Sequence, residues 1–364
     1  MPQSEASASD TEPPDVSREA EVDVAHGEAL ASLGYVNCIQ YCLEQRGDPR
    51  PKALLMGVSG EGFRLCFDRN DPERGLDVVF HNPLRAVCAA LGYDCEVVYN
   101  RDLKEAGGAL LKGLATRGCA ILRARPDWVV VQRHPSEPDS LLARLPDGQL
   151  ETWSRSQLEQ VWVKEPGLLE LGLPGYYHFV LGDKERKPDE REAAMASLRR
   201  AVRMLMRKSR IDGCAAGLAA YSELLDSLLH KQRTELQQAR ILRKYAAWNA
   251  RPLPYIRDSR RAAAQYLRMI HPHFDEETTE HLDKAADSYS LAARVLAEVP
   301  AVSDTLSPDH GDGKLPRADR KAVRGFAYLR RKAARRVRRA RQAEEEALLE
   351  IRRALEAAER KDNE

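Results

Sequence analysis

Several features that mark specialised protein classes are missing from this 364-residue sequence. Its 57 basic and 56 acidic side chains leave a formal net charge of only +1, which argues against the whole protein acting as a polyanion binder. None of the seven cysteines forms a CxxC pair of the kind found in zinc sites, so we expect reduced thiols. No run reaches the roughly 18 apolar residues that a membrane-spanning helix needs.

The first 25 residues also lack the features of a secretory signal. They contain seven acids and a single arginine, with no basic region followed by an apolar one. Because residues 1–25 are rich in Ser, Pro, Asp and Glu, we expect a disordered acidic tail. Together with the missing spanning segment, this predicts a cytoplasmic protein that makes no membrane contact.

The N-terminal half mixes helix and strand patterns. Asn82 followed by Pro83 is typical of a helix start, and Gly92 ends the helical spacing that follows. This mixture predicts an α+β domain over residues 26–184. We expect helices at 82–91, 103–118 and 154–162, and strands at 95–99, 119–124, 127–133 and 140–145.

From residue 185 onwards the pattern becomes helical, with Ala and Leu recurring at i, i+3 and i+4. It predicts a helical bundle over residues 185–300, a linker at 301–316 and one long charged amphipathic helix at 317–364. The bundle helices are expected at 189–208, 213–248, 257–270 and 277–299.

The long C-terminal helix carries an uneven charge. Between Arg317 and Arg341 there are twelve basic residues and one acid, and three glutamates follow at 344–346. The basic half could bind nucleic-acid phosphates or an anionic surface. Alternatively, it is a solvated face that pairs with an acidic half of its own or of another chain. We favour the second interpretation, which makes a protein partner more plausible than nucleic acid.

A cysteine, a helix start and a glycine-rich turn occur together in residues 34–67. Asn37 is a candidate N-cap, which would place Cys38 in the first helical turn, and Gly47 is suited to the left-handed C-cap. The positive end of the helix dipole would there favour the thiolate of Cys38. Alternatively, Cys38 and Cys42 are small apolar residues on the buried face of the helix.

The glycine-rich turn has two features that bear on function. It lacks the lysine of a phosphate-binding loop, and the residues after it alternate as a strand would at 63–67. A metal site is considered at His271 and His273, which lie near two acids. Because these histidines lie at a helix end without a cysteine or a second cluster, we predict no metal, and no cofactor.

The motifs G-x-x-N-C (34–38), MGVSGEGFR (56–64), ALGYDCEV (90–97), RGCAIL and DWVVV resemble butirosin-biosynthesis protein H-like proteins. These proteins are related to papain-like peptidases such as the bacteriocin-processing proteases. Helical segments such as GLAAYSELLDSLL resemble the helical portion that follows the papain-like half, so that the likeness covers roughly residues 28–300. The resemblance implies a papain-like domain followed by a helical domain.

The resemblance also implies thiol-mediated acyl transfer, in which an acyl group leaves a carrier-protein thioester for an amine. Cys38 matches the nucleophile. Papain-like peptidases place the activating histidine at the start of the strand that begins here with Asp127 and Trp128, so the general base is missing at that position. An aspartate replaces imidazole near neutral pH only if its pKa is strongly raised.

We therefore carry two hypotheses from the sequence. In the first, Cys38 acts with His134 as its base, rather than His81 or His178, in acyl transfer or amide or thioester hydrolysis on a small biosynthetic substrate. An acyl carrier protein is then the expected partner. In the second, the papain-like fold is inactive, and the protein works as a binding or scaffold protein that uses its helical half and its charged C-terminal helix for partners. The residues expected to bind substrate are Asn37, Ser59 and Glu61.

Overall fold

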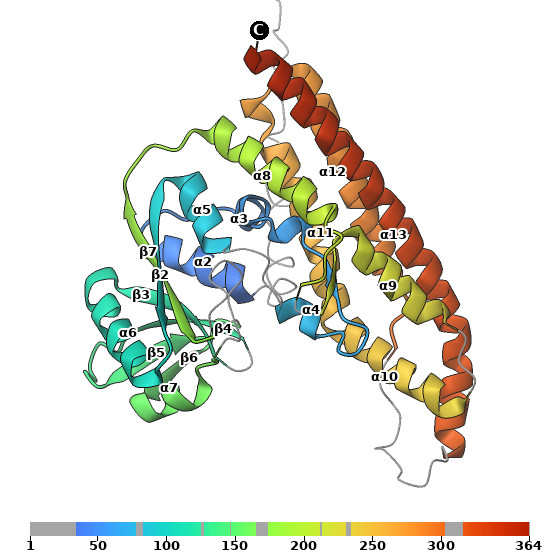
Figure 1. Ribbon diagram of the computed structural model, residues 1–364, viewed down its shortest axis with the longest axis horizontal. Helices are drawn as coiled ribbons and strands as arrows, with labels where there is room; N and C mark the ends of the chain where they lie inside the picture. The colour runs from blue at the N-terminus through green and yellow to red at the C-terminus, as the bar shows by residue number, and fades with distance from the viewer. Residues whose placement is uncertain are drawn as a thin grey trace, which may run out of the picture.

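The computed structural model describes residues 34–77, 83–124, 127–145, 147–164, 174–211, 213–230, 234–302 and 316–363. Helices and strands are mixed in the first half, and long helices make up the second, with the longest at the C-terminal end (Figure 1). The expected α+β class and the expected long C-terminal helix are confirmed.

Six antiparallel strands form the sheet of the first half, in the order β2-β7-β3-β4-β5-β6. β4 reads WVVVQR because both faces of the sheet are covered, so its consecutive valines are all buried. The six strands of the sheet are β2 (Tyr93–Asn100), β3 (Cys119–Arg123), β4 (Trp128–Arg133), β5 (Ser140–Arg144), β6 (Leu150–Ser154) and β7 (Tyr176–Lys184).

Helices cover the two faces of this sheet. Val130 and Phe179 pack with α2 (Gly34–Gln45) and α5 (Pro83–Leu91) on one face. Val131 and Val180 pack on the other face with α6 (Leu103–Arg117), while α7 (Arg155–Val161) follows β6. The helices expected at 82–91, 103–118 and 154–162 are confirmed within the described residues, whereas β6 and β7 were not expected.

The second half is a helical bundle. It contains α8 (Glu190–Leu205), α9 (Leu218–Leu229), α10 (Glu235–Ala250), α11 (Pro252–Met269), a 3-10 turn η2 (His271–His273), α12 (Glu276–Ala297) and α13 (Arg317–Asn363). The 47 residues of α13 extend about 70 Å, and α12 packs along it (Figure 1).

The single helix expected over 213–248 is wrong, because the chain turns twice within it. Gly217 has a φ of +58°, and a Cβ there would lie 2.4 Å from the carbonyl oxygen of Leu205. Thr234 then caps α10 by accepting a hydrogen bond from the backbone of Gln237.

The glycine-rich segment packs against the helical half. It forms α3 (Lys52–Ser59), the 3-10 turn η1 (Glu61–Phe63) and the two-residue strand β1 (Cys66–Phe67), which pairs with β8 (Ala215–Ala216); α4 (Arg74–Asp77) follows. Gly57 lies within α3, and a Cβ there would lie 1.9 Å from the ring of Tyr266 on α11, so glycine allows the two helices to approach this closely. The strand expected at 63–67 is therefore limited to its last two residues.

A buried ion pair joins these segments. The guanidinium of Arg260, on α11, donates two hydrogen bonds to the carboxylate of Glu344, on α13, at 2.7 and 2.9 Å, and neither side chain is exposed. Arg260 also donates to the carbonyl oxygens of Gly62 and Arg64, and Tyr221 on α9 donates to Glu344. One ion pair therefore connects the glycine-rich segment with three helices of the bundle.

Replacing Arg260 by methionine tests this connection. The substitution leaves the Glu344 carboxylate buried without its cation, so we expect a loss of about 3–5 kcal/mol in the free energy of unfolding. Urea denaturation followed by circular dichroism measures this loss.

The exposed pair between Arg199 and Glu359 is the matched control, since Arg199 also donates two hydrogen bonds to a glutamate of α13. Arg199→Met should cost less than about 1 kcal/mol. Equal losses in the two variants would contradict the structural role of the buried pair.

Candidate functional site

The helix that carries Cys38 differs from the expectation at its start. α2 is already helical at Gly34, so Asn37 is not its N-cap and Cys38 lies beyond the first turn. The effect of a helix dipole on a charge decays within that turn. The expected end is confirmed, because Gly47 adopts a φ of +70° and its amide donates to Glu44.

α2 lies along β4 and aligns its residues with those of the strand. The Tyr35 ring packs edge-on against Trp128 at 4.5 Å between ring centroids. Six residues later, the Tyr41 hydroxyl donates to the side chain of Gln132 at 3.4 Å. Cys38, between the two tyrosines, consequently lies at the level of Val130.

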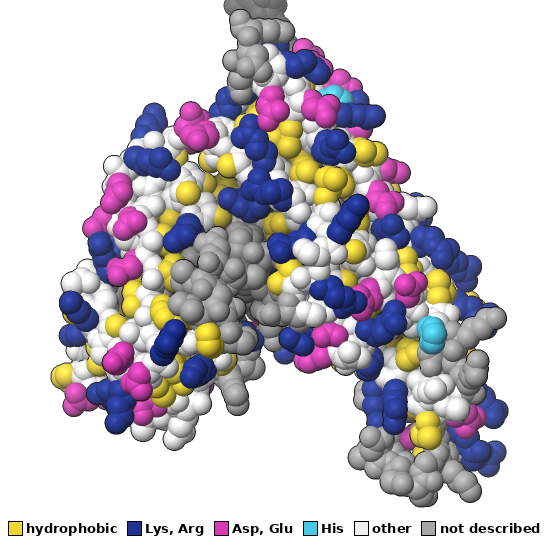
Figure 2. Space-filling view, in the orientation of Figure 1, with side chains coloured by type: hydrophobic (Ala, Val, Ile, Leu, Met, Phe, Trp, Pro, Cys, Tyr) yellow, Lys and Arg dark blue, Asp and Glu magenta, His cyan; other side chains and the backbone are white. Residues whose placement is uncertain are grey.

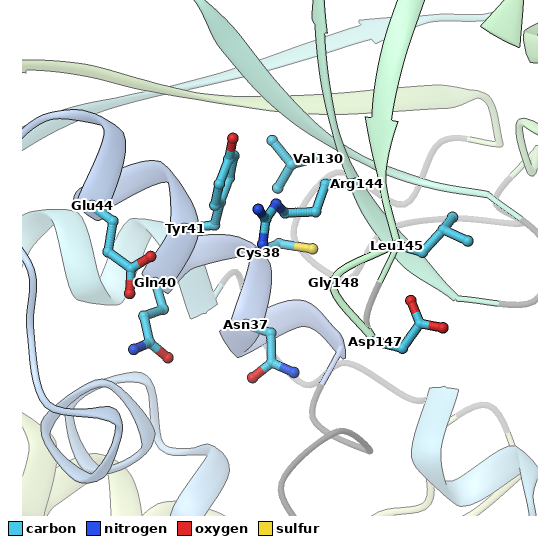
Figure 3. A pocket seen from close by; sticks show the side chains of 10 residues that line it. All are labelled: Asn37, Cys38, Gln40, Tyr41, Glu44, Val130, Arg144, Leu145, Asp147 and Gly148. Carbon is cyan, nitrogen blue, oxygen red and sulfur yellow. The ribbon is translucent and has the colours of Figure 1, made fainter. Parts of the chain in front are cut away.

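A cavity of about 240 Å³ opens beside Cys38 (Figure 3). Its walls come from α2, from Val130 on β4, and from the end of β5 with the turn that follows it. The lining residues are Asn37, Cys38, Gln40, Tyr41, Glu44, Val130, Arg144, Leu145, Asp147 and Gly148. The structure therefore places two of the predicted site residues, Asn37 and Cys38, in one cavity.

The thiol of Cys38 is poorly suited to ionise. Its side chain belongs to the hydrophobic core and is 4% exposed. Burial raises the pKa of Cys38 far above its ordinary value, and the negative charge of Asp127 and the nearby Cys119 raise it further. Asp127 occupies the position at which the resemblance placed a histidine. The negative charge of its carboxylate therefore disfavours the thiolate of Cys38, whereas an imidazolium would favour it.

His134 does not lie beside Cys38. It follows β4, four residues beyond Val130, which corresponds to about 13 Å along a strand. Its Nδ1 accepts hydrogen bonds from the backbone amides of Ser136 and Glu137, so the ring stabilises the turn that leads into β5. The predicted pairing of His134 with Cys38 is corrected on these grounds.

The other two histidines considered from the sequence do not supply the base. His81 lies outside the described residues. His178, on β7, is completely buried and faces the opposite side of the sheet, where its ring is 6.1 Å from that of Trp162. It is therefore separated from Cys38 by the sheet itself.

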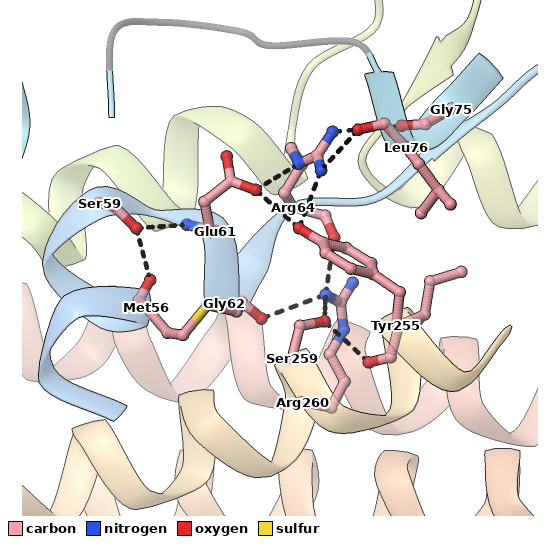
Figure 4. A network of polar contacts seen from close by, with 11 residues as sticks. Met56, Ser59, Glu61, Gly62, Arg64, Gly75, Leu76, Tyr255, Ser259 and Arg260 are labelled. Atoms are coloured by element: carbon pink, nitrogen blue, oxygen red, sulfur yellow. Dashed lines mark hydrogen bonds and ion pairs between the residues drawn. The ribbon is translucent and has the colours of Figure 1, made fainter. Parts of the chain in front are cut away.

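Ser59 and Glu61, which were expected to bind substrate, lie instead in the contact between the two halves (Figure 4). Ser59 donates to the carbonyl oxygen of Met56 and accepts from the amide of Glu61. The Glu61 carboxylate accepts hydrogen bonds from Arg64 at 2.7 Å and from the Tyr255 hydroxyl at 2.6 Å. Both side chains are engaged in internal hydrogen bonds, so we remove them from the substrate-binding prediction.

Arg144 was missed at the sequence level. It lies opposite Val130 in the pairing of β4 with β5, so both side chains point to the face covered by α2. Its guanidinium lies over the ring of Tyr41, 4.2 Å from the centroid. Its Nε is buried and has no hydrogen-bond partner among the described residues. The sequence contained one signal for Arg144. It is the last residue of the strand SLLAR, and strand alternation places it on the same face as Leu142.

The described residues offer neither a metal site nor a membrane span as a further candidate. No group of three or more His, Cys, Asp or Glu side chains is arranged to hold a metal ion in the part of the chain that the structure describes. Among the described helices, none is both long enough and apolar enough to cross a membrane.

Comparison with known proteins adds no family. No protein-family model matches the chain, and no curated protein is significantly similar to it. The functional argument therefore rests on the cavity and its residues.

The buried imidazole of His178 predicts a specific dependence of stability on pH. Burial lowers its pKa from 6.5 to about 4, so the unfolded chain binds this proton more readily than the folded one. Its contribution to stability is intact above pH 6.5 and is lost as the pH falls towards 4. Between pH 7.5 and pH 5, this residue alone should remove about 2 kcal/mol from the free energy of unfolding.

Urea denaturation of the natural protein and of His178→Leu at both pH values measures this contribution. The natural protein should lose about 2 kcal/mol more than the variant on acidification. His230→Gln, at an exposed histidine, is the control and should behave like the natural protein. An identical loss in the natural protein and His178→Leu would refute the assignment.

Proposed function

We propose that the protein is a non-catalytic member of the papain-like group that binds a small zwitterionic molecule in the cavity beside Cys38. One observation carries this proposal. The cavity is lined by a buried thiol, whose ionisation is disfavoured by burial and by the charge of Asp127, and by Arg144, whose Nε lacks a partner among the described residues.

Three features support the papain-like part of the proposal. A cysteine-bearing helix packs against an antiparallel sheet, and Cys38 lies near the beginning of that helix. Asp127 precedes the strand on which the activating histidine was expected, and its charge acts on Cys38. In the proposal, Cys38 therefore occupies a nucleophile position whose partner has been replaced.

The presence of Asp127 where a histidine was expected also argues against acyl transfer. Thiol catalysis needs a base that removes the proton and a charge that stabilises the thiolate. Asp127 supplies neither, because its side chain is 3.8 Å from the guanidinium of Arg251 and its negative charge disfavours the thiolate. Burial of Cys38 also restricts the approach of a bulky carrier-bound thioester. We therefore choose the binding hypothesis over the acyltransferase.

The size and charges of the cavity define its ligand. A volume near 240 Å³ is below the roughly 300–1,000 Å³ of sites for drug-sized molecules, so the ligand is small. The Arg144 guanidinium offers hydrogen bonds to a carboxylate. Glu44 and Asp147 are exposed lining residues, and their charges favour an ammonium group. An amino-acid-like molecule carries both groups.

Calorimetric titration with a panel of α- and ω-amino acids tests the proposal. At least one member should bind, and Arg144→Gln should weaken its affinity by about 10- to 100-fold, because a hydrogen bond to a charged group contributes roughly 1.5–3 kcal/mol. Acetate and ethylamine, which carry one charge each, should bind more weakly than the best amino acid.

Arg133→Gln is the matched control. Arg133 is exposed at the end of β4, outside the cavity lining, and donates to the carbonyl oxygen of Leu111. It should leave ligand affinity unchanged. Failure of every amino acid to bind, or equal binding by Arg144→Gln, would refute the ligand assignment. Alkylation of Cys38 by iodoacetamide much faster than that of Cys66 or Cys214 would refute the non-catalytic assignment.

A further inference from the structure

The solvent face of α13 carries many cations along its first half, and several Lys and Arg side chains lie at the outer edge of the bundle in Figure 2. We call this group of cations the basic stripe. It consists of nine exposed residues: Arg317, Arg320, Lys321, Arg324, Arg331, Lys332, Arg335, Arg338 and Arg339.

Helix geometry places the whole basic stripe on one side. At 100° per residue, its members fall within an arc of about 120°, and the 22 steps from the first to the last extend about 33 Å. The opposite side of the helix is buried in the bundle through residues such as Val323, Phe326 and Val337. The basic stripe is thus a straight, one-sided surface on a helix that its own bundle holds in place.

Acids within the described chain leave the basic stripe largely unneutralised. The single acid in this half, Asp319, is buried, and Glu344 is committed to Arg260. Glu345 pairs with Arg341, which is outside the basic stripe. Only Arg324 has a recorded ion pair among the described residues, to Glu235 at 3.7 Å. Within the described residues, the basic stripe forms no ion pair with the acids of its own helix, and its expected pairing with another chain stays a prediction.

Neighbouring charges reinforce this excess. Arg330, beside the basic stripe, is partly buried and donates to the carbonyl oxygen of His230. Burial and the positive charge of Arg331 lower the pKa of Arg330. Glu298, which follows the last residue of α12, pairs with Arg336, which is outside the basic stripe. An external polyanion is consequently the natural counter-charge for the exposed cations.

The surroundings of the basic stripe distinguish between polyanions. Insertion into a membrane needs an accessible apolar face, but that face of α13 is occupied by the bundle. Single strands are bound through stacking on aromatic side chains, and Tyr328, which is 66% exposed, is the only aromatic residue on this half of the helix besides the buried Phe326. A regular array of phosphates fits a rigid, straight row of cations better.

We propose that the basic stripe binds the phosphate backbone of duplex nucleic acid without reading its sequence. Its length of about 33 Å matches one turn of a B-form duplex, about 34 Å, so one helix can reach phosphates on both sides of a groove. Arginine predominates in the row, and its guanidinium suits phosphate oxygens through paired hydrogen bonds.

Fluorescence anisotropy with labelled 20-base-pair DNA and RNA duplexes tests this proposal between 50 and 300 mM salt. Two unrelated sequences should bind the full-length protein with equal affinity. About four phosphate contacts would give a slope near −3.6 for the logarithm of the affinity against that of the salt concentration. Comparison of the DNA and RNA arms shows which duplex geometry is preferred.

A variant with four substitutions removes the positive charges at one end of the basic stripe, and a second variant with four substitutions serves as the control. The first carries Arg331→Gln, Arg335→Gln, Arg338→Gln and Arg339→Gln. It should bind duplex at least about 30-fold more weakly at 100 mM salt and flatten the slope by about 0.9 for each phosphate contact that is lost. The control removes the same charge from exposed lysines elsewhere, at Lys104, Lys112, Lys187 and Lys208.

The control should change duplex affinity by less than about threefold, since its lysines make no phosphate contact. Circular dichroism checks that both variants keep the helix content of the natural protein. Three results would overturn the proposal: no salt-dependent duplex binding, tighter binding to single strands or to vesicles with 30% anionic lipid, or equal losses in the two variants.

Discussion

The bidentate contact between Arg260 and Glu344 is the constraint on which the arrangement of the chain depends. Two charges removed from water are costly unless their hydrogen bonds are satisfied, and here further partners supply those bonds. The carbonyl oxygens of Gly62 and Arg64 accept from the guanidinium, and Tyr221 donates to the carboxylate. The pair therefore fixes the glycine-rich segment against the bundle and fixes the register of α13.

Two regions that are adjacent in the sequence, the glycine-rich segment and the helix that carries Cys38, lie in different parts of the structure. The glycine-rich segment lies in the contact between the halves, whereas Cys38 faces a cavity between α2 and the sheet. Arg144 and Asp127 then decide what the cavity can do. One offers a cation to a ligand, and the other opposes ionisation of the thiol. The same helix packing that buries the apolar side of α13 leaves its basic side facing solvent.

The sequence predicted most of the fold but little of the site. Periodicity and caps located α6, α12 and the buried run of β4, since those signals are local. It missed β7, whose residues Tyr176–Lys184 follow a break that contains Gly and Pro. It also predicted one helix over 213–248, although Gly217 and Thr234 mark the starts of two separate helices. The site depends on long-range pairing. The pairing of Val130 with Arg144 follows from sheet register, which no local pattern specifies.

The central claim is that the sheet half and the helical bundle form one cooperative unit, joined through the glycine-rich segment and the buried ion pair. Native-state hydrogen exchange in increasing urea measures this most directly, because it resolves the opening free energy of individual segments. We expect the slowest amides of β3, β4, α11 and α13 to merge into one opening reaction with a common free energy. A sheet half that opens at a distinctly lower free energy, while α11 and α13 remain protected, would contradict the account.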